Sequence, residues 1–161
     1  MNKSRIPAAQ KEVLSLLLDD HKRAKQLFKD FESQQDDAAK EDIAHTVCME
    51  LQIHTELEER HFYPFLRRQD PEAFGDLLDE AKVEHDSAKS LIGQILSMKP
   101  GDDLYDAKVI VLGEYVSHHV KEEEEELFPQ IISKKIDLRE MLDPMMETKE
   151  RMQGQLAPAT A

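Results

Sequence analysis

The sequence is poor in the residues on which disulfide-rich and turn-rich proteins depend. Cys48 is the only cysteine among 161 residues, which excludes an intramolecular disulfide and a cysteine-rich zinc site. Five glycines and seven prolines are too few for a chain with many tight turns. The frequent Leu, Ala, Glu, Lys, Gln and Met residues are strong helix formers. The composition therefore predicts a helical protein, and the single thiol fits a reducing cytoplasm.

Positive charge and long apolar runs are also scarce. Only 21 Lys and Arg residues stand against 34 Asp and Glu residues, for a formal charge of −13. So acidic a surface repels phosphate backbones, and no basic stripe is present, so we expect no nucleic-acid partner. The longest apolar runs, such as residues 16–18, are far shorter than the roughly 20 residues that span a bilayer. We therefore expect no membrane association, and the amphipathic segment after residues 1–10 argues against export.

Apolar side chains recur at spacings of three and four over most of the chain, which is the period of a helix with one buried face. The pattern predicts helices over residues 8–32 and 37–66. A third is predicted from the turn at Asp70-Pro71 toward residue 99, and a fourth, capped by Asp102 or Asp103, up to Pro129. A shorter fifth helix is predicted over residues 131–152 with an interruption near Pro144, followed by an unpacked tail over residues 153–161.

Four long helices with short connections pack most simply as an antiparallel, up-down-up-down four-helix bundle. We therefore expect an all-α fold with the bundle in residues 1–135 and a C-terminal helical extension in residues 136–161. No strand pattern competes with this interpretation. The core of such a bundle is a common place for a buried metal or cofactor.

The first half of the predicted bundle is repeated in the second half. His21 has its counterpart in His85, 85 − 21 = 64 residues later, and the His54-x-x-x-Glu58 motif recurs as His119-x-x-x-Glu123, 119 − 54 = 65 residues later. Each half then ends with an aromatic-Pro pair, at 63–64 and 128–129. This repetition is far more specific than a single His-x-x-x-Glu motif in so acidic a chain.

Residues four apart lie on one face of a helix, so each His-x-x-x-Glu motif can present two ligands. Together the repeated residues would place four imidazoles and two carboxylates in the bundle core, which predicts a site for two metal ions. This donor mixture favours iron or manganese over copper or zinc. If both glutamates bridge and a solvent-derived oxo or hydroxo group links the ions, each ion keeps an open position. The predicted ligands are His21, His54, Glu58, His85, His119 and Glu123.

Other histidines and two further polar residues lie near this pattern. His118 also has a glutamate four residues on, but the repeat favours His119 as the ligand. His45 should face away from the site, and His61 is more consistent with its rim. Glu50 and Tyr115 each lie one helical turn before a predicted ligand, so both are candidates for side chains that contact the ligands from outside.

On these residues the chain resembles the hemerythrin-like, or HHE cation-binding, family of non-heme di-iron four-helix bundles, over about residues 10–130. The resemblance implies the same six ligands and a cofactor of two iron ions, with manganese left open. Respiratory hemerythrins carry a second histidine where this chain has Lys89, and an aspartate where it has Glu123. The chain is therefore similar to a branch with four histidines and two glutamates. The extra carboxylate should stabilise ferric iron and so favours redox turnover over reversible oxygen carriage.

The expected small-molecule partner is hydrogen peroxide, dioxygen or nitric oxide, and the simplest enzymatic activity is decomposition of peroxide. The alternative is a protein that senses a gas or handles iron without turnover, which as a sensor would require a protein partner. We find no nucleotide-binding or phosphate-binding motif that would add another cofactor.

Overall fold

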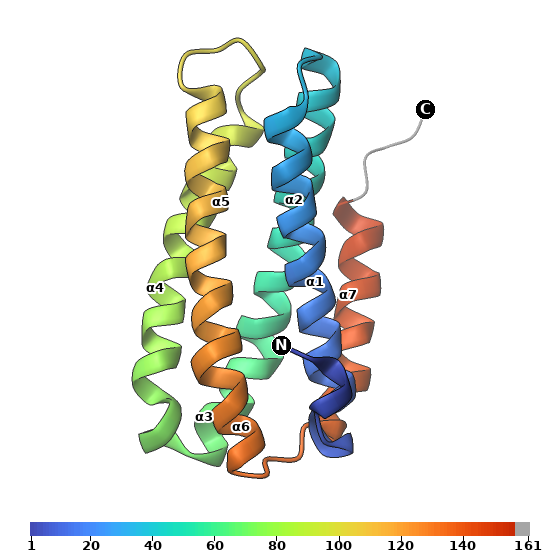
Figure 1. Cartoon of the computed structure of the whole chain (residues 1–161), viewed down its shortest axis with the longest axis vertical. Coiled ribbons are helices and arrows are strands. Elements are labelled where there is room, and N and C mark those ends of the chain that lie inside the picture. Colours follow the sequence, from blue (N-terminus) through green and yellow to red (C-terminus); the bar gives the residue numbers. More distant parts are fainter. Residues whose placement is uncertain (157–161) are drawn as a thin grey trace.

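In the computed structural model, which describes residues 1–156, four long helices run antiparallel (Figure 1). They are α1 (Ala8–Ser33), α2 (Asp37–Leu57), α4 (Pro71–Leu96) and α5 (Tyr105–Glu122). Helix α1 packs against α2 and α5, and α4 packs against the same two helices. The structure confirms the predicted up-down-up-down bundle. None of the described helices combines the length and hydropathy that crossing a bilayer requires.

Shorter helical segments extend the bundle at its lower end in Figure 1 and along one side. Two of them are π-helical and continue α2 and α5 without a break. In chain order these segments are η1 (Lys3–Arg5), η2 (Glu58–Phe62), α3 (Tyr63–Gln69), η3 (Glu123–Leu127), α6 (Phe128–Ser133), η4 (Arg139–Met141) and α7 (Leu142–Leu156).

The π-helical segments occupy the same place in both halves of the repeat. In each, the N–H of the next aromatic residue bonds to the carbonyl five residues earlier, Tyr63 to Glu58 and Phe128 to Glu123. The second helix was predicted to end at residue 66, and α3 carries it to Gln69; the predicted end of the fourth helix at Pro129 was wrong, because α6 carries that helix on to Ser133. A proline removes one backbone donor and crowds the preceding turn, and the wider π turn accommodates it.

Aspartate side chains cap the starts of two long helices, but not that of α5, for which a cap was predicted. The Asp36 and Asp70 carboxylates accept backbone N–H groups of Ala39 and Ala73, as N-cap side chains do. The prediction that Asp102 or Asp103 caps the fourth helix was wrong. Asp102 instead accepts the N–H of Lys99 within the preceding loop, and no side chain caps α5.

The apolar core is divided into two clusters, one toward each end of the bundle. The lower cluster includes Leu14, Leu57, Phe62, Leu66, Phe74 and Phe128. The upper cluster includes Leu27, Phe31, Val47, Cys48, Ile92 and Leu112. Buried histidines and glutamates occupy the level between them. The layering places a polar centre where apolar side chains shield it from both ends.

The C-terminal extension packs against the bundle through α7, which lies along α2 (Figure 1). The predicted interruption near Pro144 was wrong. Pro144 lies in the first turn of α7, where backbone N–H groups need no partner within the helix, and the break falls before Leu142 instead. Residues 153–156 continue α7 with exposed side chains, and the rest of the predicted unpacked tail lies outside the described residues.

Two adjacent methionines in α7 test how firmly the extension is attached. Met145 is fully buried in the lower cluster, whereas Met146 is 44% exposed. We expect Met145→Ala to lower the free energy of unfolding by about 2–5 kcal/mol, because it removes a buried side chain and leaves a cavity. The matched Met146→Ala variant should change it by less than about 0.5 kcal/mol. Urea unfolding of both variants measures the difference, and equal effects would contradict this packing.

Candidate metal centre

The six side chains selected from the sequence repeat lie together at the level between the two apolar clusters. The four histidines come one each from α1, α2, α4 and α5, and the two glutamates are the first residues of η2 and η3. All six are buried, from Glu58 at 0% exposure to His119 at 9%. They therefore do not lie on a solvated helix face, where most charged and polar residues are found.

Glu58 lies at the centre of this arrangement. Its Oε1 atom is 3.3 Å from Nε2 of His54, 3.3 Å from Nε2 of His85 and 3.7 Å from Nε2 of His119. Glu123 holds a similar place on the other side, with Oε1 3.1 Å from Nε2 of His21 and Oε2 3.6 Å from Nε2 of His119. Two groups of potential ligands result, and Glu58 belongs to both: His21, His54, Glu58 and Glu123, then Glu58, His85 and His119.

The polar atoms of the cluster fit metal ions better than they fit one another. Glu58 Oε1 and Oε2 and His54 Nε2 are fully buried and make no hydrogen bond of acceptable geometry within the described residues. Such orphaned atoms are costly in a protein interior. Two ligands about 2.1 Å from one ion and about 90–120° apart are about 3.0–3.6 Å from each other, close to the separations found here. The donor set thus accepts a cation at both groups.

Mutual attraction across the cluster also shifts its protonation. Burial alone would lower the pKa of the His54 imidazole, but Glu58 and Asp20 beside it raise that pKa to about 10. Burial would raise the pKa of Glu58, yet His54 and the other partners hold it well below its ordinary value. Without a metal, the attraction between the His54 imidazolium and the Glu58 carboxylate therefore helps to hold the cluster together.

Each of the four histidines meets a second carboxylate through its other ring nitrogen. The Nδ1 atoms of His21 and His85 lie 3.0 Å from carboxylate oxygens of Glu124 and Glu59. An Nδ1–H donated to a carboxylate turns Nε2, as a free acceptor, toward the centre of the cluster. The complete pairs, in chain order of the histidines, are His21–Glu124, His54–Asp20, His85–Glu59 and His119–Glu84.

These four outer carboxylates were not identified in the sequence, although a signal was present. Each is the immediate neighbour of a predicted ligand: Asp20 and Glu84 precede histidines, and Glu59 and Glu124 follow glutamates. All four occur at matching places in the two halves of the repeat. The pairing itself crosses between helices, so only the folded chain shows which carboxylate meets which histidine.

An aromatic residue directly after each π-helical segment covers one histidine. Phe128 stacks on His21, with ring centroids 6.0 Å apart, and Tyr63 stacks on His85 at 5.5 Å. Only Tyr63 carries a hydroxyl group, which donates a 2.7 Å hydrogen bond to Glu123 Oε2. Burial and the neighbouring Glu123 and Glu58 raise the pKa of Tyr63 well above its ordinary value, so it remains a donor. This single hydroxyl distinguishes the two halves of the cluster.

The geometry matches a known family of cation-binding bundles. The family model described as "Hemerythrin HHE cation binding domain" matches residues 12–131. The chain belongs to this hemerythrin HHE family. The match spans both halves of the repeat and all six clustered side chains.

A solved structure supports the same fold. The crystal structure of a hemerythrin HHE cation-binding-domain-containing protein from Mycobacterium kansasii superposes with a TM-score of 0.71 at 19% sequence identity. The similarity covers 88% of this chain and 86% of that one. Among curated protein sequences, none matches this chain significantly.

The remaining histidines of this hemerythrin HHE domain lie outside the cluster. The side chain of His118 is 65% exposed and contacts Glu84 and Glu122, so His119 rather than His118 joins the central group. His45 is exposed on α2, as expected. His61 is partly buried and contacts Thr148 of α7 through a 2.8 Å hydrogen bond.

Glu50 and Tyr115, the two sequence candidates for outer contacts, lie at the wall of a cavity instead. The cavity has a volume of about 50 Å³ and is lined by all four clustered histidines. No hydrogen bond or ion pair in the described residues joins either residue to the six. Glu50 pairs with Arg23, and Tyr115 is 46% exposed. Their place in the structure is at the approach to the cluster, beside Arg23.

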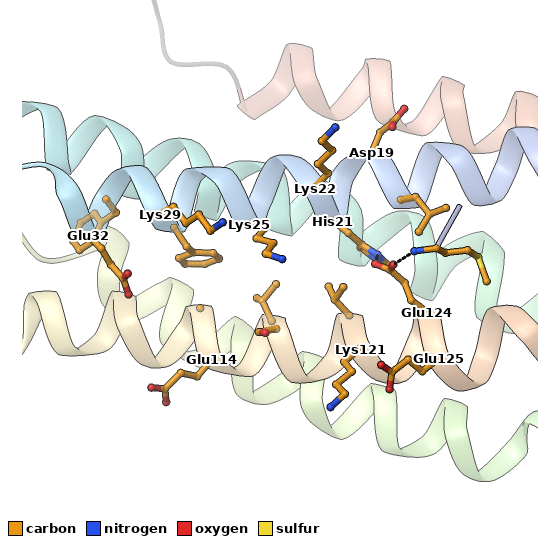
Figure 2. A pocket seen from close by; sticks show the side chains of 18 of the residues that line it. Asp19, His21, Lys22, Lys25, Lys29, Glu32, Glu114, Lys121, Glu124 and Glu125 are labelled. Atoms are coloured by element: carbon orange, nitrogen blue, oxygen red, sulfur yellow. Dashed lines mark hydrogen bonds and ion pairs between the residues drawn. The ribbon is translucent and has the colours of Figure 1, made fainter. Parts of the chain in front are cut away.

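A wider groove reaches His21 from outside the bundle, between α1 and α5 (Figure 2). Its volume is about 1100 Å³. Lys25 and Lys29 project from α1 toward the groove, while His21 and Glu124 meet at its edge (Figure 2). His21 thus lines both the small cavity and this groove.

Proposed function

We propose that the chain is a non-heme di-iron protein that decomposes hydrogen peroxide. The two ions would be held by His21, His54, Glu58 and Glu123 on one side and by Glu58, His85 and His119 on the other. The observation that carries this proposal is the buried Glu58 carboxylate, whose oxygens have no hydrogen-bond partner in the described residues and whose Oε1 faces three imidazoles. A mixture of imidazoles and carboxylates suits iron, with manganese as the nearest competitor.

The size of the cavity over the cluster supports a small reactant. A volume of about 50 Å³ exceeds the roughly 10–15 Å³ that one water molecule needs, so it can admit peroxide or a diatomic gas. It is far smaller than the roughly 300–1,000 Å³ of pockets for larger organic ligands. Peroxide disproportionation, in which two peroxide molecules give one dioxygen and two water molecules, needs no organic substrate.

The protein's own residues would hold and isolate this chemistry. When bound, iron supplies the electron transfer that peroxide disproportionation requires. The outer carboxylates fix the four imidazoles with Nε2 inward, and the two apolar clusters keep bulk water away. The Tyr63 hydroxyl keeps its proton and donates a hydrogen bond to Oε2 of Glu123.

Metal content and oxygen release test the proposal together. Protein produced with ample iron should contain about two iron atoms per chain by elemental analysis, and adding peroxide should release dioxygen at an electrode. Protein stripped of metal is the control and should release none. Near-zero metal would overturn the site, whereas two iron atoms without oxygen release would overturn the enzymatic role and favour a protein that binds a gas or iron without turnover.

The single hydroxyl at Tyr63 provides a finer test. Tyr63→Phe gives this half of the cluster the same side chain that Phe128 provides in the other, so we expect the fold and the metal content to be retained. Glu123 then loses a charge-assisted hydrogen bond, and the rate of oxygen release should fall by about 10–100-fold. The matched control is Tyr105→Phe, which also removes one buried hydroxyl, because Tyr105 lies in the upper apolar cluster and its hydroxyl makes no hydrogen bond in the described residues. Unchanged rates in Tyr63→Phe would contradict a role for the hydroxyl.

A further inference from the structure

The four outer carboxylates differ in what neutralises them. Asp20 binds the ammonium group of Lys149 at 3.0 Å, and Glu59 binds Lys82 and Lys89 at 3.0 and 2.8 Å. Glu124 binds the N-terminal ammonium group at 3.2 Å. An ammonium group thus faces the outer side of three of the four carboxylates.

The fourth outer carboxylate, Glu84, has no lysine or arginine within ion-pair distance in the described part of the chain. Its Oε1 atom lies 3.5 Å from Nδ1 of the clustered His119, and its Oε2 atom lies 3.6 Å from Nε2 of His118. The same Nε2 atom is 3.1 Å from Oε1 of Glu122. Nε2 of His118 therefore lies between the carboxylates of Glu84 and Glu122. At the other three outer carboxylates, the corresponding place is occupied by a lysine or by the N-terminal ammonium group.

We propose that Glu84, His118 and Glu122 form a third divalent-cation site, on the surface of the bundle. Their ligand atoms lie within 4.8 Å of one another, close enough to share one ion. A cation there supplies the positive charge that lysines and the N-terminus supply at the other outer carboxylates. The exposed side of His118 leaves room for water ligands, as cations such as Mn²⁺ accept alongside carboxylates.

The surface site is chemically distinct from the buried cluster, and it does not depend on the iron proposal. It shares no ligand with the six clustered residues, although His118 and Glu122 precede His119 and Glu123 in the chain. In the described residues, its side-chain contact with the six is that of Glu84 with His119. With one histidine, exposed surroundings and open positions, it should bind and release its ion more readily than the buried groups do.

Binding of Mn²⁺ to the iron-loaded protein tests this site, with free Mn²⁺ measured by electron paramagnetic resonance. We expect one Mn²⁺ per chain in addition to the buried metal, and a weakening of at least about tenfold in His118→Ala and Glu122→Gln. The matched control is His45→Ala, which removes another exposed histidine and should bind as the unaltered protein does. Equal Mn²⁺ binding by His118→Ala and His45→Ala would overturn the proposal.

A second pair of variants separates this site from the buried one. Mn²⁺ that remains bound in Glu58→Gln but is lost in Glu58→Gln combined with His118→Ala belongs to the surface site, whether or not the buried cluster holds iron. Mn²⁺ that disappears in Glu58→Gln alone belongs to the buried cluster, and the surface proposal then fails.

Discussion

Removal of iron with a chelator is expected to lower the melting temperature of the protein by about 10 °C. A ligand that binds only the folded state, at about 1,000 times its dissociation constant, stabilises that state by about 4 kcal/mol. For a chain of this size, each kcal/mol corresponds to about 2–4 °C. The decrease in melting temperature is limited because attraction between imidazolium and carboxylate groups replaces part of the metal–ligand interaction, as the raised pKa of His54 indicates. Differential scanning calorimetry with and without chelator measures the shift.

The same chelator should leave the melting temperature of Glu58→Gln unchanged, because that variant would hold no metal to remove. This comparison separates loss of the bound ions from any direct effect of the chelator on the protein. A melting curve of the unaltered protein that does not move on chelation would favour a structural role for the cluster, with no metal bound.

The periodicity of apolar residues was sufficient to predict the number, order and approximate ends of the long helices. The errors arose where local rules compete. Pro129 is a helix-stopping residue by propensity, yet the π turn before it lets the helix continue, as another does before Pro64. Pro144 breaks a helix interior but is well tolerated in a first turn. Helix periodicity does not distinguish these cases, because each depends on where the proline falls relative to the backbone donors.

The clustered side chains could be selected from the sequence because the repeat fixed their spacing twice. The outer carboxylates that contact them could not be assigned from the sequence. The contact of Asp20 with His54, and that of Glu84 with His119, each join different helices, so their pairing depends on how the helices are rotated in the bundle. The expectation that Glu50 and Tyr115 face inward came from a spacing of four alone, and a residue one turn away from a ligand can equally lie at the rim.

The repeat also explains why departures from symmetry are informative. Both halves use a π turn, an aromatic residue over a histidine and a carboxylate on each Nδ1 atom. Tyr63 against Phe128, and His118 where the other outer carboxylates meet a cationic group, are two positions at which the halves differ near the cluster. A symmetrical cluster alone would hold two similar ions. The hydroxyl on one side therefore favours unequal roles for the two positions.

Replacement of Glu58 is expected to remove both metal ions, not one. Glu58 belongs to both ligand groups, and its Oε1 atom lies within 3.3–3.7 Å of three imidazoles. Glu58→Gln keeps the size of the side chain but removes its charge, so iron content should fall from about two atoms per chain to near zero. Oxygen release from peroxide should fall by at least about 100-fold with it. Elemental analysis and an oxygen electrode provide the two measurements.

The matched control for Glu58→Gln is Glu56→Gln, two residues away on the same helix. Glu56 is partly exposed and pairs with Arg60 at the surface, where an ion pair contributes little, so its replacement should change neither metal content nor oxygen release. Circular dichroism establishes that Glu58→Gln remains helical, and Glu58→Asp, which keeps the charge on a shorter side chain, should retain part of the metal. Because a carboxylate that served only one ion would leave the other in place, retention of one iron atom in Glu58→Gln would show that Glu58 is not shared.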